Sequence, residues 1–379
     1  MAGPLSGIKI IEMAGLGPAP FAAMLLSDMG AEIIRIQAKN GTPAIPILNT
    51  KFDVLARGRR SMAIDLKKPA SVDALLQMLE KADCLLEGFR PGVMERLGLG
   101  PEICLKQNPK LVYGRMTGWG QNGPLADRAG HDINYIALSG VLNAIGRKDT
   151  PPAIPLNLIG DFGGGQMMAF GIVCAILEAK TSGKGQVVDV AMTDSTALMA
   201  SMLYGFKAAG MWSNERYANL LDGATHFYDT YECSDGKFMA VGAIEPQFYR
   251  QLLEVLDITD DDFKRQNDST MWEELKERMK AIFLTKPRDT WAEMFEGVDA
   301  CVSPVLDWDE AIAHPHNQAR ETFTEIAGVV QPSPTPKFSR STPDTPTPPS
   351  AKDEDTLEIL ADWGISNEAI NQLRDDEAI

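Results

Sequence analysis

The feature that most constrains the fold is an alternation of strand-like and helix-like segments in the first third of the chain. Short apolar runs at residues 8–11, 33–36 and 84–87 are separated by longer segments of helical character at residues 18–29 and 72–81. Strands that alternate with helices in this way are joined by crossovers, so the strands run parallel and the helices cover the sheet. The sequence therefore predicts an α/β fold with a Rossmann-like parallel sheet in its large domain.

The pattern of the chain changes after about residue 222. Aromatic and apolar residues flank a turn at Ser234-Asp235-Gly236, which indicates a β-hairpin rather than a crossover. Residues 331–352 contain seven prolines, and this composition favours an extended strap. Because 379 residues exceed the usual size of a single core, we expect two domains, or one large domain with a lobe. We predict a large domain at 1–200, a linker at 201–224, a small α+β domain at 225–325, and a proline-rich strap with C-terminal helices at 326–379 that rejoins the large domain.

The charge of the chain argues against several classes of partner. Lys and Arg number 36 against 52 Asp and Glu, a net charge of −16, which disfavours binding to nucleic acid and anionic membrane surfaces. Residues 1–7 lack a basic region ahead of an apolar run, and no stretch approaches the ~20 apolar residues of a membrane span. Five widely spaced cysteines without a C-x-x-C motif indicate reduced thiols. We expect a cytoplasmic protein that binds no nucleic acid and does not insert into membranes.

Two motifs associated with cofactors are incomplete. Gly15-Leu16-Gly17 follows the first predicted strand, but the third position of the dinucleotide fingerprint is Pro20, which favours a tight strand-to-helix turn. The chain has four histidines and no H-E-x-x-H motif, and the two in His314-Pro315-His316 are too close in sequence to share one helix face. The sequence therefore predicts neither a nicotinamide cofactor nor a catalytic metal.

A cluster of basic residues stands out in this acidic chain. Arginine donates paired hydrogen bonds to phosphate, and helix N-termini favour anions, so such a cluster suits a pyrophosphate and a ribose phosphate. A solvated face is an equally good interpretation of the spacing alone. The cluster comprises Arg57, Arg59, Arg60, Lys67 and Lys68, and Arg90 precedes Pro91 at a predicted helix start.

Three positions carry candidate acid and base groups. His131-Asp132 opens an apolar segment, where free N–H groups at a helix start stabilise an oxyanion, and a capping Asp beside a structural His is the alternative. Asp161 lies just before three glycines, which allow close approach of a ligand, although it equally suits a plain N-cap. Glu245 follows an apolar strand, where it either orients an imidazole or ends the strand.

Taken together, these segments resemble the family III CoA-transferases and, within that family, its α-methylacyl-CoA racemases. The resemblance extends along nearly the whole chain. The likeness to the broad family and its CoA site is carried by residues 4–12, 30–36, 57–67 and 87–98. The more specific likeness to racemases is carried by residues 130–135, 227–233 and 242–249.

The resemblance implies an enzyme that interconverts the 2R and 2S forms of 2-methylacyl-CoA thioesters without a cofactor. His131 and Asp161 would serve as acid and base on opposite faces of the substrate, with Glu245 paired to His131 and Asp132 paired to Asp161. Racemisation requires two such groups, because one group that returns its own proton mostly restores the original configuration. The resemblance also implies an interlocked homodimer. The CoA contacts that it implies are Arg35, Arg59, Arg60, Lys67, Arg90 and Tyr135.

Two other functions remain open at this point. In a CoA-transferase, Asp161 attacks the acyl-CoA as a nucleophile to form a mixed anhydride, and His131 has no obligatory role. In a non-catalytic acyl-CoA binder, the basic cluster matters and the acid and base groups do not. Uptake of deuterium at the α-carbon in D2O, with no acceptor acid present, is expected only for the racemase.

Overall fold

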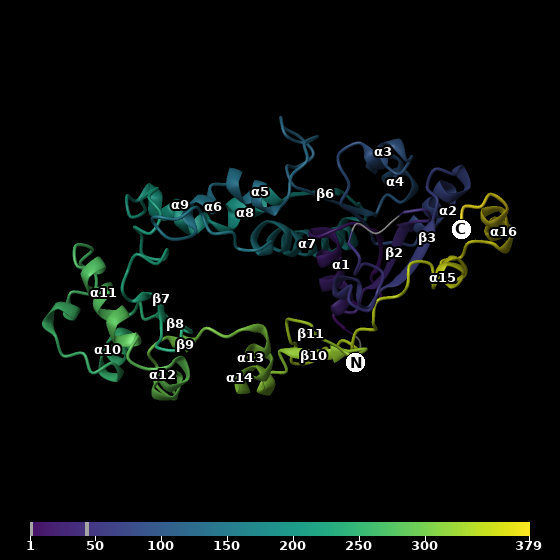
Figure 1. Ribbon diagram of the computed structural model, residues 1–379. Helices are drawn as coiled ribbons and strands as arrows, with labels where there is room; N and C mark the ends of the chain where they lie inside the picture. Colours follow the sequence, from purple (N-terminus) through teal and green to yellow (C-terminus); the bar gives the residue numbers. More distant parts are fainter. Residues whose placement is uncertain (1–2, 42–44) are drawn as a thin grey trace. The chain divides into compact units, whose positions relative to one another are not determined.

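A parallel β-sheet forms the centre of the larger of two units into which the chain divides (Figure 1). Its six strands lie in the order β3-β2-β1-β4-β5-β6 and every neighbouring pair is parallel, which confirms the predicted α/β fold. The strand order reverses between β1 and β4, the place where ligands bind in open sheets of this kind. The strands are β1 (Lys9–Met13), β2 (Glu32–Ala38), β3 (Arg60–Ile64), β4 (Cys84–Glu87), β5 (Val112–Thr117) and β6 (Val187–Ala191).

The computed structural model describes residues 3–41 and 45–379. Met1 and Ala2, the first residues of the N-terminal segment that lacks a basic region, lie outside the described residues. Each of the two units is assembled from separate stretches of chain. The larger unit comprises Met1–Ser139, Leu156–Met199 and Ala319–Ile379, and the smaller unit comprises Gly140–Pro155 and Ala200–Gln318.

Apolar side chains at alternate positions of the strands pack against helices on the two faces of the sheet. Ile10 on β1 lies in a core with α1 (Pro18–Asp28) and α7 (Gly163–Ser182), whereas its neighbour Ile11 lies in a second core with α2 (Pro69–Leu79). This burial on both faces explains the continuous apolar runs in the sequence. The second core also takes the C-terminal helices α15 (Thr356–Asp362) and α16 (Asn367–Asp375). The larger unit further contains η1 (Val54–Ala56), α3 (Val93–Arg96), α4 (Pro101–Gln107), α5 (Asp132–Leu138), η2 (Leu158–Phe162), α8 (Met192–Met199), β10 (Phe323–Ile326) and β11 (Val329–Pro332).

The smaller unit is built on an antiparallel sheet with the strand order β7-β8-β9. The predicted turn at Ser234-Asp235-Gly236 joins β7 to β8, and Gly236 has a φ of 76°, which glycine adopts without a side-chain clash. The aromatic side chains of Phe227, Tyr231 and Trp291 lie in the core of this unit. Its elements are α6 (Val141–Ala144), α9 (Ser201–Ala208), β7 (Tyr228–Glu232), β8 (Phe238–Gly242), α10 (Pro246–Val255), η3 (Asp261–Lys264), α11 (Trp272–Phe283), α12 (Arg288–Met294), β9 (Val302–Pro304) and α13 (Trp308–Ala313), followed by α14 (Pro315–Ala319).

The division of the chain differs from the predicted domains in the segments that connect the two units. Residues 140–155 belong to the smaller unit, although the large domain was expected to run without a break from 1 to 200. Residues 201–224, expected as a linker, contain α9 and also belong to the smaller unit. Contacts between residues distant in sequence, such as the hydrogen bond from the Arg216 side chain to the main-chain carbonyl of Arg147, hold these segments in one unit. Local sequence patterns carry no record of such contacts.

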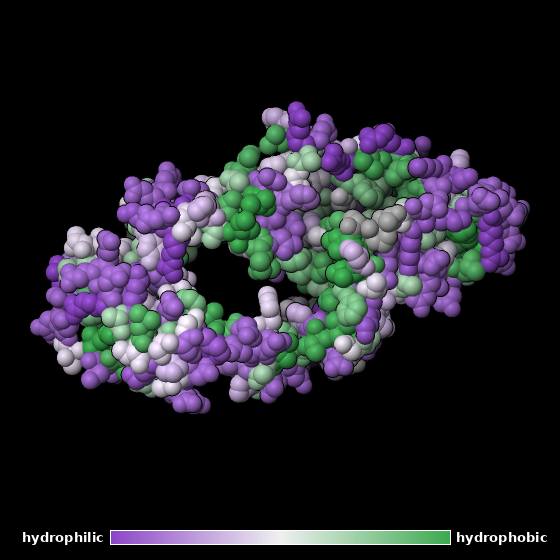
Figure 2. Space-filling view, viewed as in Figure 1, coloured by the Kyte–Doolittle hydropathy of each residue, from purple (hydrophilic) through white to green (hydrophobic). Residues whose placement is uncertain are grey.

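One helical stretch, Leu158–Ser182, is long and apolar enough to span a membrane by length and composition, which corrects the expectation that no segment has this property. Half of its most apolar window is buried in the structure, and α7, its main part, packs against α1, β5 and β6, so core packing accounts for much of its apolar character. Its outward side chains include Phe170 and Leu177, which are 66% and 68% exposed. Figure 2 shows hydrophobic residues gathered on the visible face around α5, α7 and α8.

Candidate active site

A pocket of about 310 Å³ in the larger unit lies at the carboxyl ends of three central strands. Gly17 lines it from the loop after β1, Arg90 from the loop after β4 and Trp119 from the loop after β5. His131 and Asp161 line the same pocket, which therefore brings the two predicted acid and base residues together beside the reversal of strand order. The other lining residues are Leu16, Pro18, Ala19, Gly88, Phe89, Pro91, Met116, Thr117, Gly118, Ala126, Arg128, Ala129, Gly130, Tyr135 and Met192.

Asp161 lies in the π-helical turn η2, immediately before α7. Burial raises the pKa of its carboxyl, the hydrogen bond from Asn157 Nδ2 to Oδ2 at 3.1 Å opposes this shift, and the negative charge of Asp132 adds to it. Gly17, with a φ of 70°, leaves room for the carboxylate, because a Cβ at this position would lie 3.2 Å from Asp161 Oδ2. Asp161 is thus a carboxyl whose proton is held more firmly than usual at the edge of a pocket.

Asp132 holds the backbone of the turn that carries Asp161. Its Oδ2 accepts the main-chain N–H groups of Gly160 at 2.6 Å and Asp161 at 2.9 Å. The side chain is buried, and among the described residues its Oδ1 has no hydrogen-bond partner. Gly160 permits this close approach, since a Cβ there would lie 2.7 Å from Asp132 Oδ2. The observed link joins the Asp132 carboxylate to the main chain at Asp161, and a proton shared by the two carboxyl groups stays a prediction.

His131 is the exposed N-cap residue of α5. Its main-chain N–H donates to Asn134 Oδ1 at 3.0 Å, and the hydroxyl of Tyr135 donates to the carbonyl of the preceding Gly130. The Tyr135 ring packs edge-on against Trp119 with centroids 4.8 Å apart. These contacts fix the backbone on both sides of His131, which lines the pocket.

Glu245 is the exposed N-cap residue of α10, and it follows β8 in the smaller unit. Pro246 occupies the first position of this helix, where the missing N–H is tolerated. Glu245 and His131 thus belong to different units, and their pairing stays a prediction.

The predicted basic cluster consists of side chains with very different surroundings. Arg59 and Glu12 form a fully buried ion pair with Nη1 and Oε2 2.6 Å apart, and Arg35 Nη1 lies 3.2 Å from a buried oxygen of Asp53. Neither arginine lines the pocket. Their charges are already balanced inside the larger unit, where buried ions need a partner of opposite charge.

The remaining predicted CoA contacts are more accessible. Arg60 is one-third exposed and pairs with Glu32 at 3.0 Å and with Asp362 at 2.6 Å. Lys67 and Arg90 are exposed, and Arg90 lines the pocket. Of the basic residues proposed from the sequence, Arg90 is therefore the one that the structure brings to His131 and Asp161.

Comparison with known proteins identifies the family. Residues 5–355 match the CoA-transferase family III. The chain belongs to this family. The "Alpha-methylacyl-CoA racemase" of Mus musculus is 46% identical over 382 residues, 99% of this chain and 97% of that protein, and the protein of the same name from Homo sapiens is 44% identical over 384 residues with the same coverage. The solved structure of a hypothetical protein, Rv3272, from Mycobacterium tuberculosis has a TM-score of 0.80 and 25% identity, and the match covers 94% of this chain and 99% of that one.

Two features of this family III CoA-transferase pocket were missed by reasoning from the sequence. Arg128 lines the pocket from the irregular segment between β5 and α5, where no periodicity marks a functional position. Gly17 was assigned to a tight turn, whereas its lack of a side chain also makes room for Asp161. The signal for Gly17 was present, since a glycine before two prolines indicates a special backbone conformation, but its partner lies far away in sequence.

The described residues offer no evident site at which side chains could bind a metal ion. Over residues 3–41 and 45–379, no group of three or more His, Cys, Asp or Glu side chains is arranged to hold a metal ion. The pocket instead combines proton-transfer groups, His131 and Asp161, with the cationic side chains of Arg90 and Arg128. Independence from metals and cofactors stays a prediction.

Proposed function

We propose that this protein is an α-methylacyl-CoA racemase that interconverts 2R- and 2S-2-methylacyl-CoA thioesters. The observation that carries the proposal is the presence of His131 and Asp161 in one pocket, in a chain 46% and 44% identical to proteins named as racemases of this kind. A histidine and a carboxyl of raised pKa both suit proton transfer near neutral pH.

The reaction follows from the roles of these two groups. One of them takes the proton on the α-carbon, and the electrons of the broken C–H bond form the enolate double bond while the thioester oxygen becomes negative. The other group then gives its proton to the opposite face of the α-carbon, and the carbonyl re-forms. His131 and Asp161 exchange roles when the other enantiomer is the substrate.

The substrate assignment rests on charge as well as on likeness. We assign Arg90, Lys67 and Arg60 to the phosphates of CoA, because these side chains are accessible and arginine binds phosphate through paired hydrogen bonds. Arg35 and Arg59 act indirectly in this proposal, since their buried ion pairs hold the backbone next to β2 and β3. Tyr135 contributes its ring to the pocket wall while its hydroxyl holds Gly130.

We also propose that the active protein is a homodimer. Several large apolar side chains of the larger unit are more than half exposed, among them Phe170, Leu177 and Leu198. Large apolar side chains that remain exposed in such numbers are typical of protein interfaces. Sedimentation velocity over a range of concentrations tests the proposal, and a species with the mass of 41.3 kDa at all concentrations would contradict it.

A cytoplasmic location is proposed on the basis of the thiols. All five cysteines are free, and Cys84, Cys104 and Cys233 are buried. Free thiols persist in reducing compartments. Fractionation of the native cells, with an antibody to this chain, tests the location.

A CoA-transferase remains the second candidate, because the family carries that name and Asp161 lines the pocket. A transferase requires an acceptor acid and forms a covalent adduct on the carboxylate. The racemase requires neither. The two functions therefore differ in what happens when acyl-CoA is the sole substrate.

The deciding experiment is incubation of each pure enantiomer of a 2-methylacyl-CoA with the protein in D2O, without an acceptor acid. We expect deuterium at the α-carbon by NMR and conversion to the other enantiomer. His131→Ala and Asp161→Ala should each abolish interconversion, whereas His316→Ala, which removes an exposed histidine, should not. Absence of exchange together with a trapped adduct on Asp161 would establish the transferase instead.

A further inference from the structure

The chain between His131 and Asp161 leaves the larger unit and returns to it. Residues Gly140–Pro155 belong to the smaller unit, whereas the residues on either side belong to the larger unit. Apart from the single turn α6, this excursion contains no helix or strand. An irregular segment has no ladder of backbone hydrogen bonds to fix it, so its position depends on side chains.

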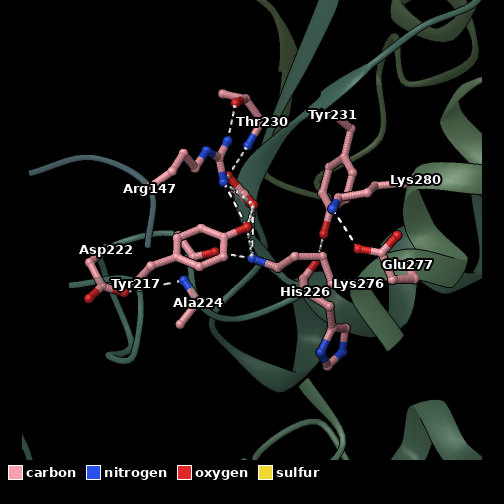
Figure 3. A network of polar contacts seen from close by, with 12 residues as sticks. Arg147, Tyr217, Asp222, Ala224, His226, Thr230, Tyr231, Lys276, Glu277 and Lys280 are labelled. Atoms are coloured by element: carbon pink, nitrogen blue, oxygen red, sulfur yellow. Dashed lines mark hydrogen bonds and ion pairs between the residues drawn. The ribbon is translucent and has the colours of Figure 1, made fainter. Parts of the chain in front are cut away.

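Arg147 is the first of these side chains (Figure 3). Its Nη1 donates to an oxygen of Asp229 at 2.6 Å and to the hydroxyl of Tyr217 at 2.8 Å, and its Nη2 donates to Thr230 Oγ1 at 3.1 Å. The guanidinium also lies over the Tyr217 ring, 5.0 Å from its centroid. Asp229 and Thr230 are on β7, so the excursion is held against a regular strand.

Lys276 completes the charge balance behind this contact. Its Nζ lies 2.8 Å from Asp229 Oδ2 and 3.0 Å from the Tyr217 hydroxyl, and it also bonds to the carbonyl of Gly223. The Lys276 and Asp229 side chains are 3% and 5% exposed. Burial opposes ionisation of Asp229, yet hydrogen bonds from Arg147 and Lys276 outweigh it and lower the pKa of this carboxyl. The ion pair is therefore charged and sequestered.

Arg216 holds the backbone of the excursion directly. Its guanidinium donates to three main-chain carbonyls, those of Thr150 at 2.7 Å, Arg147 at 3.0 Å and Asn143 at 3.2 Å. One side chain thus fixes the path of the chain from 143 to 150. We call the set Arg147, Arg216, Tyr217, Asp229 and Lys276 the excursion clamp.

The base of the same loop is closed by a single carboxylate. Asp132 Oδ2 accepts the N–H groups of Gly160 and Asp161, which joins the residue after His131 to the turn that bears Asp161. The loop from 132 to 160 is thus tied at its base by Asp132 and at its tip by the excursion clamp. Residues 140–155 are continuous in sequence with the segments that bear His131 and Asp161.

We propose that the excursion clamp is a positioning device for the proton-transfer pair, an inference that rests on the proposed function of His131 and Asp161. The clamp residues do not touch the reacting atoms. They restrict residues 140–155 and thereby the segments on which the two groups are mounted. A misplacement of about 1 Å in reacting groups lowers rates by about 10²-fold, so loss of the clamp should reduce turnover far more than binding.

The test compares two arginines of the smaller unit that have similar surroundings. Arg278, like Arg147, is partly exposed, pairs with carboxylates, those of Asp260 and Asp262, and lies over an aromatic ring, at 4.8 Å from the centroid of Phe263. Its segment, α11, is far in sequence from His131 and Asp161. Arg147→Ala should lower kcat for enantiomer interconversion by about 10- to 100-fold with KM within about twofold. Arg278→Ala should change neither, and Arg147→Lys, which keeps the charge but not the fork, should give an intermediate kcat.

Amide hydrogen exchange supplies a readout that is independent of catalysis. Arg147→Ala should speed exchange in peptides covering 131–139 and 156–162, and Arg278→Ala should not. Unchanged exchange and unchanged kcat in Arg147→Ala and Arg147→Lys would overturn the positioning role even if wild-type protein racemises its substrate. If wild-type protein fails to exchange the α-proton while Arg147→Ala still loosens these peptides, the proposed function is wrong and the clamp stands. A fall in kcat with equal loosening of all peptides would reduce the clamp to a general contribution to stability.

Discussion

Asp161 in the larger unit and Asp229 in the smaller unit show how surroundings give two carboxylates opposite properties. Asp161 accepts one side-chain hydrogen bond, from the neutral amide of Asn157, and burial raises its pKa. Asp229 is contacted by the cations of Arg147 and Lys276, which lower its pKa although burial opposes them. A carboxylate that accepts few hydrogen bonds keeps a pKa high enough for proton transfer. A carboxylate enclosed by cations stays ionised and stabilises the fold.

The largest effect is expected for Asp161→Asn. The amide has the shape of the carboxyl but cannot transfer a proton, so interconversion of 2-methylacyl-CoA enantiomers should fall about 10³-fold. Because the pKa of folded Asp161 is raised above 3.8, the folded state binds this proton more tightly, and ionisation at higher pH destabilises the fold. The variant should therefore be at least as stable to urea at pH 7 as the wild type.

Asp189→Asn is the matched control for this change, since Asp189 is exposed and accepts a single main-chain N–H from Gln121 at 3.2 Å. It should retain wild-type interconversion. If the Asp161→Asn protein is stable and turns over at nearly the wild-type rate, Asp161 does not transfer the proton. The contrast in role between Asp161 and Asp229 would then be wrong.

Asp229→Asn should lower the stability of the protein, which Asp161→Asn should not. The change leaves Arg147 and Lys276 without their shared counter-ion, and removal of one partner from a buried pair costs about 3–5 kcal/mol of unfolding free energy. The pKa of Asp229 is lowered, so its contribution to stability is present above pH 3.8 and is lost as the pH falls through the folded pKa. Urea denaturation at pH 7 and at low pH measures both effects. If the variant and the wild type are equally stable at pH 7, the ion pairs of Asp229 with Arg147 and Lys276 do not contribute to the free energy of unfolding.

His226 in the smaller unit is a second buried group whose pKa is shifted, and it is a base rather than an acid. It is fully buried, its Nε2 lies 2.7 Å from the Tyr249 hydroxyl, and its Nδ1 has no hydrogen-bond partner among the described residues. Tyr249 donates to the Phe263 carbonyl at 2.9 Å, so His226 Nε2 is the donor to Tyr249. Burial, and then the charge of Lys276, lower the pKa of His226 from 6.5 to about 4.

The sign of the pH effect follows from proton counting. Between pH 6.5 and about 4 the unfolded histidine is protonated and the folded one is not, so the free energy of unfolding falls as the pH is lowered through this window. The loss is at most about 3 kcal/mol and is complete near the folded pKa. His226→Asn should flatten this part of the profile in urea denaturation, and His316→Ala, at an exposed site, should leave it unchanged. A profile that keeps its slope in His226→Asn assigns the pH dependence to other groups.

The parts of the fold visible in the sequence are those specified by local patterns. Ile10 and Ile11 on β1 belong to a continuous apolar run because each faces a different core, and such a run predicts a buried parallel strand. The turn at Ser234-Asp235-Gly236 predicted the hairpin of β7 and β8. No local pattern indicates the contacts of residues 140–155, since these depend on Arg216 and Asp229, which are far along the chain.

The candidate site was predicted in the same uneven way. His131 and Asp161 stood next to distinctive glycines and matched a known family, and they do meet in one pocket. The arginines illustrate the limit. Nothing in the neighbouring sequence distinguishes Arg59 from Arg90. In the structure, Arg59 is buried against Glu12, which is 47 residues away in sequence, whereas Arg90 is exposed and lines the pocket. The burial of a charge depends on tertiary partners that no local pattern identifies.

This difference between the two arginines gives the smallest and last predicted effect. Arg90→Ala should weaken binding of an acyl-CoA by about tenfold, the loss expected for one charge-assisted contact, and should leave unfolding by urea unchanged because the side chain is exposed. The weakening should be greater at low ionic strength, where attraction between Arg90 and a phosphate is least screened. Titration calorimetry with a CoA thioester at two salt concentrations measures the change in affinity.

Arg96→Ala is the control for this prediction. Arg96 is exposed on α3 and does not line the pocket, so the variant should bind like the wild type at both salt concentrations. Arg59→Ala should instead lower stability, because it leaves Glu12 buried and unpaired. If Arg90→Ala binds as tightly as the wild type, the CoA phosphates lie elsewhere and the assignment to Arg90 is wrong. A loss of affinity in Arg59→Ala at unchanged stability would instead make Arg59 a direct contact.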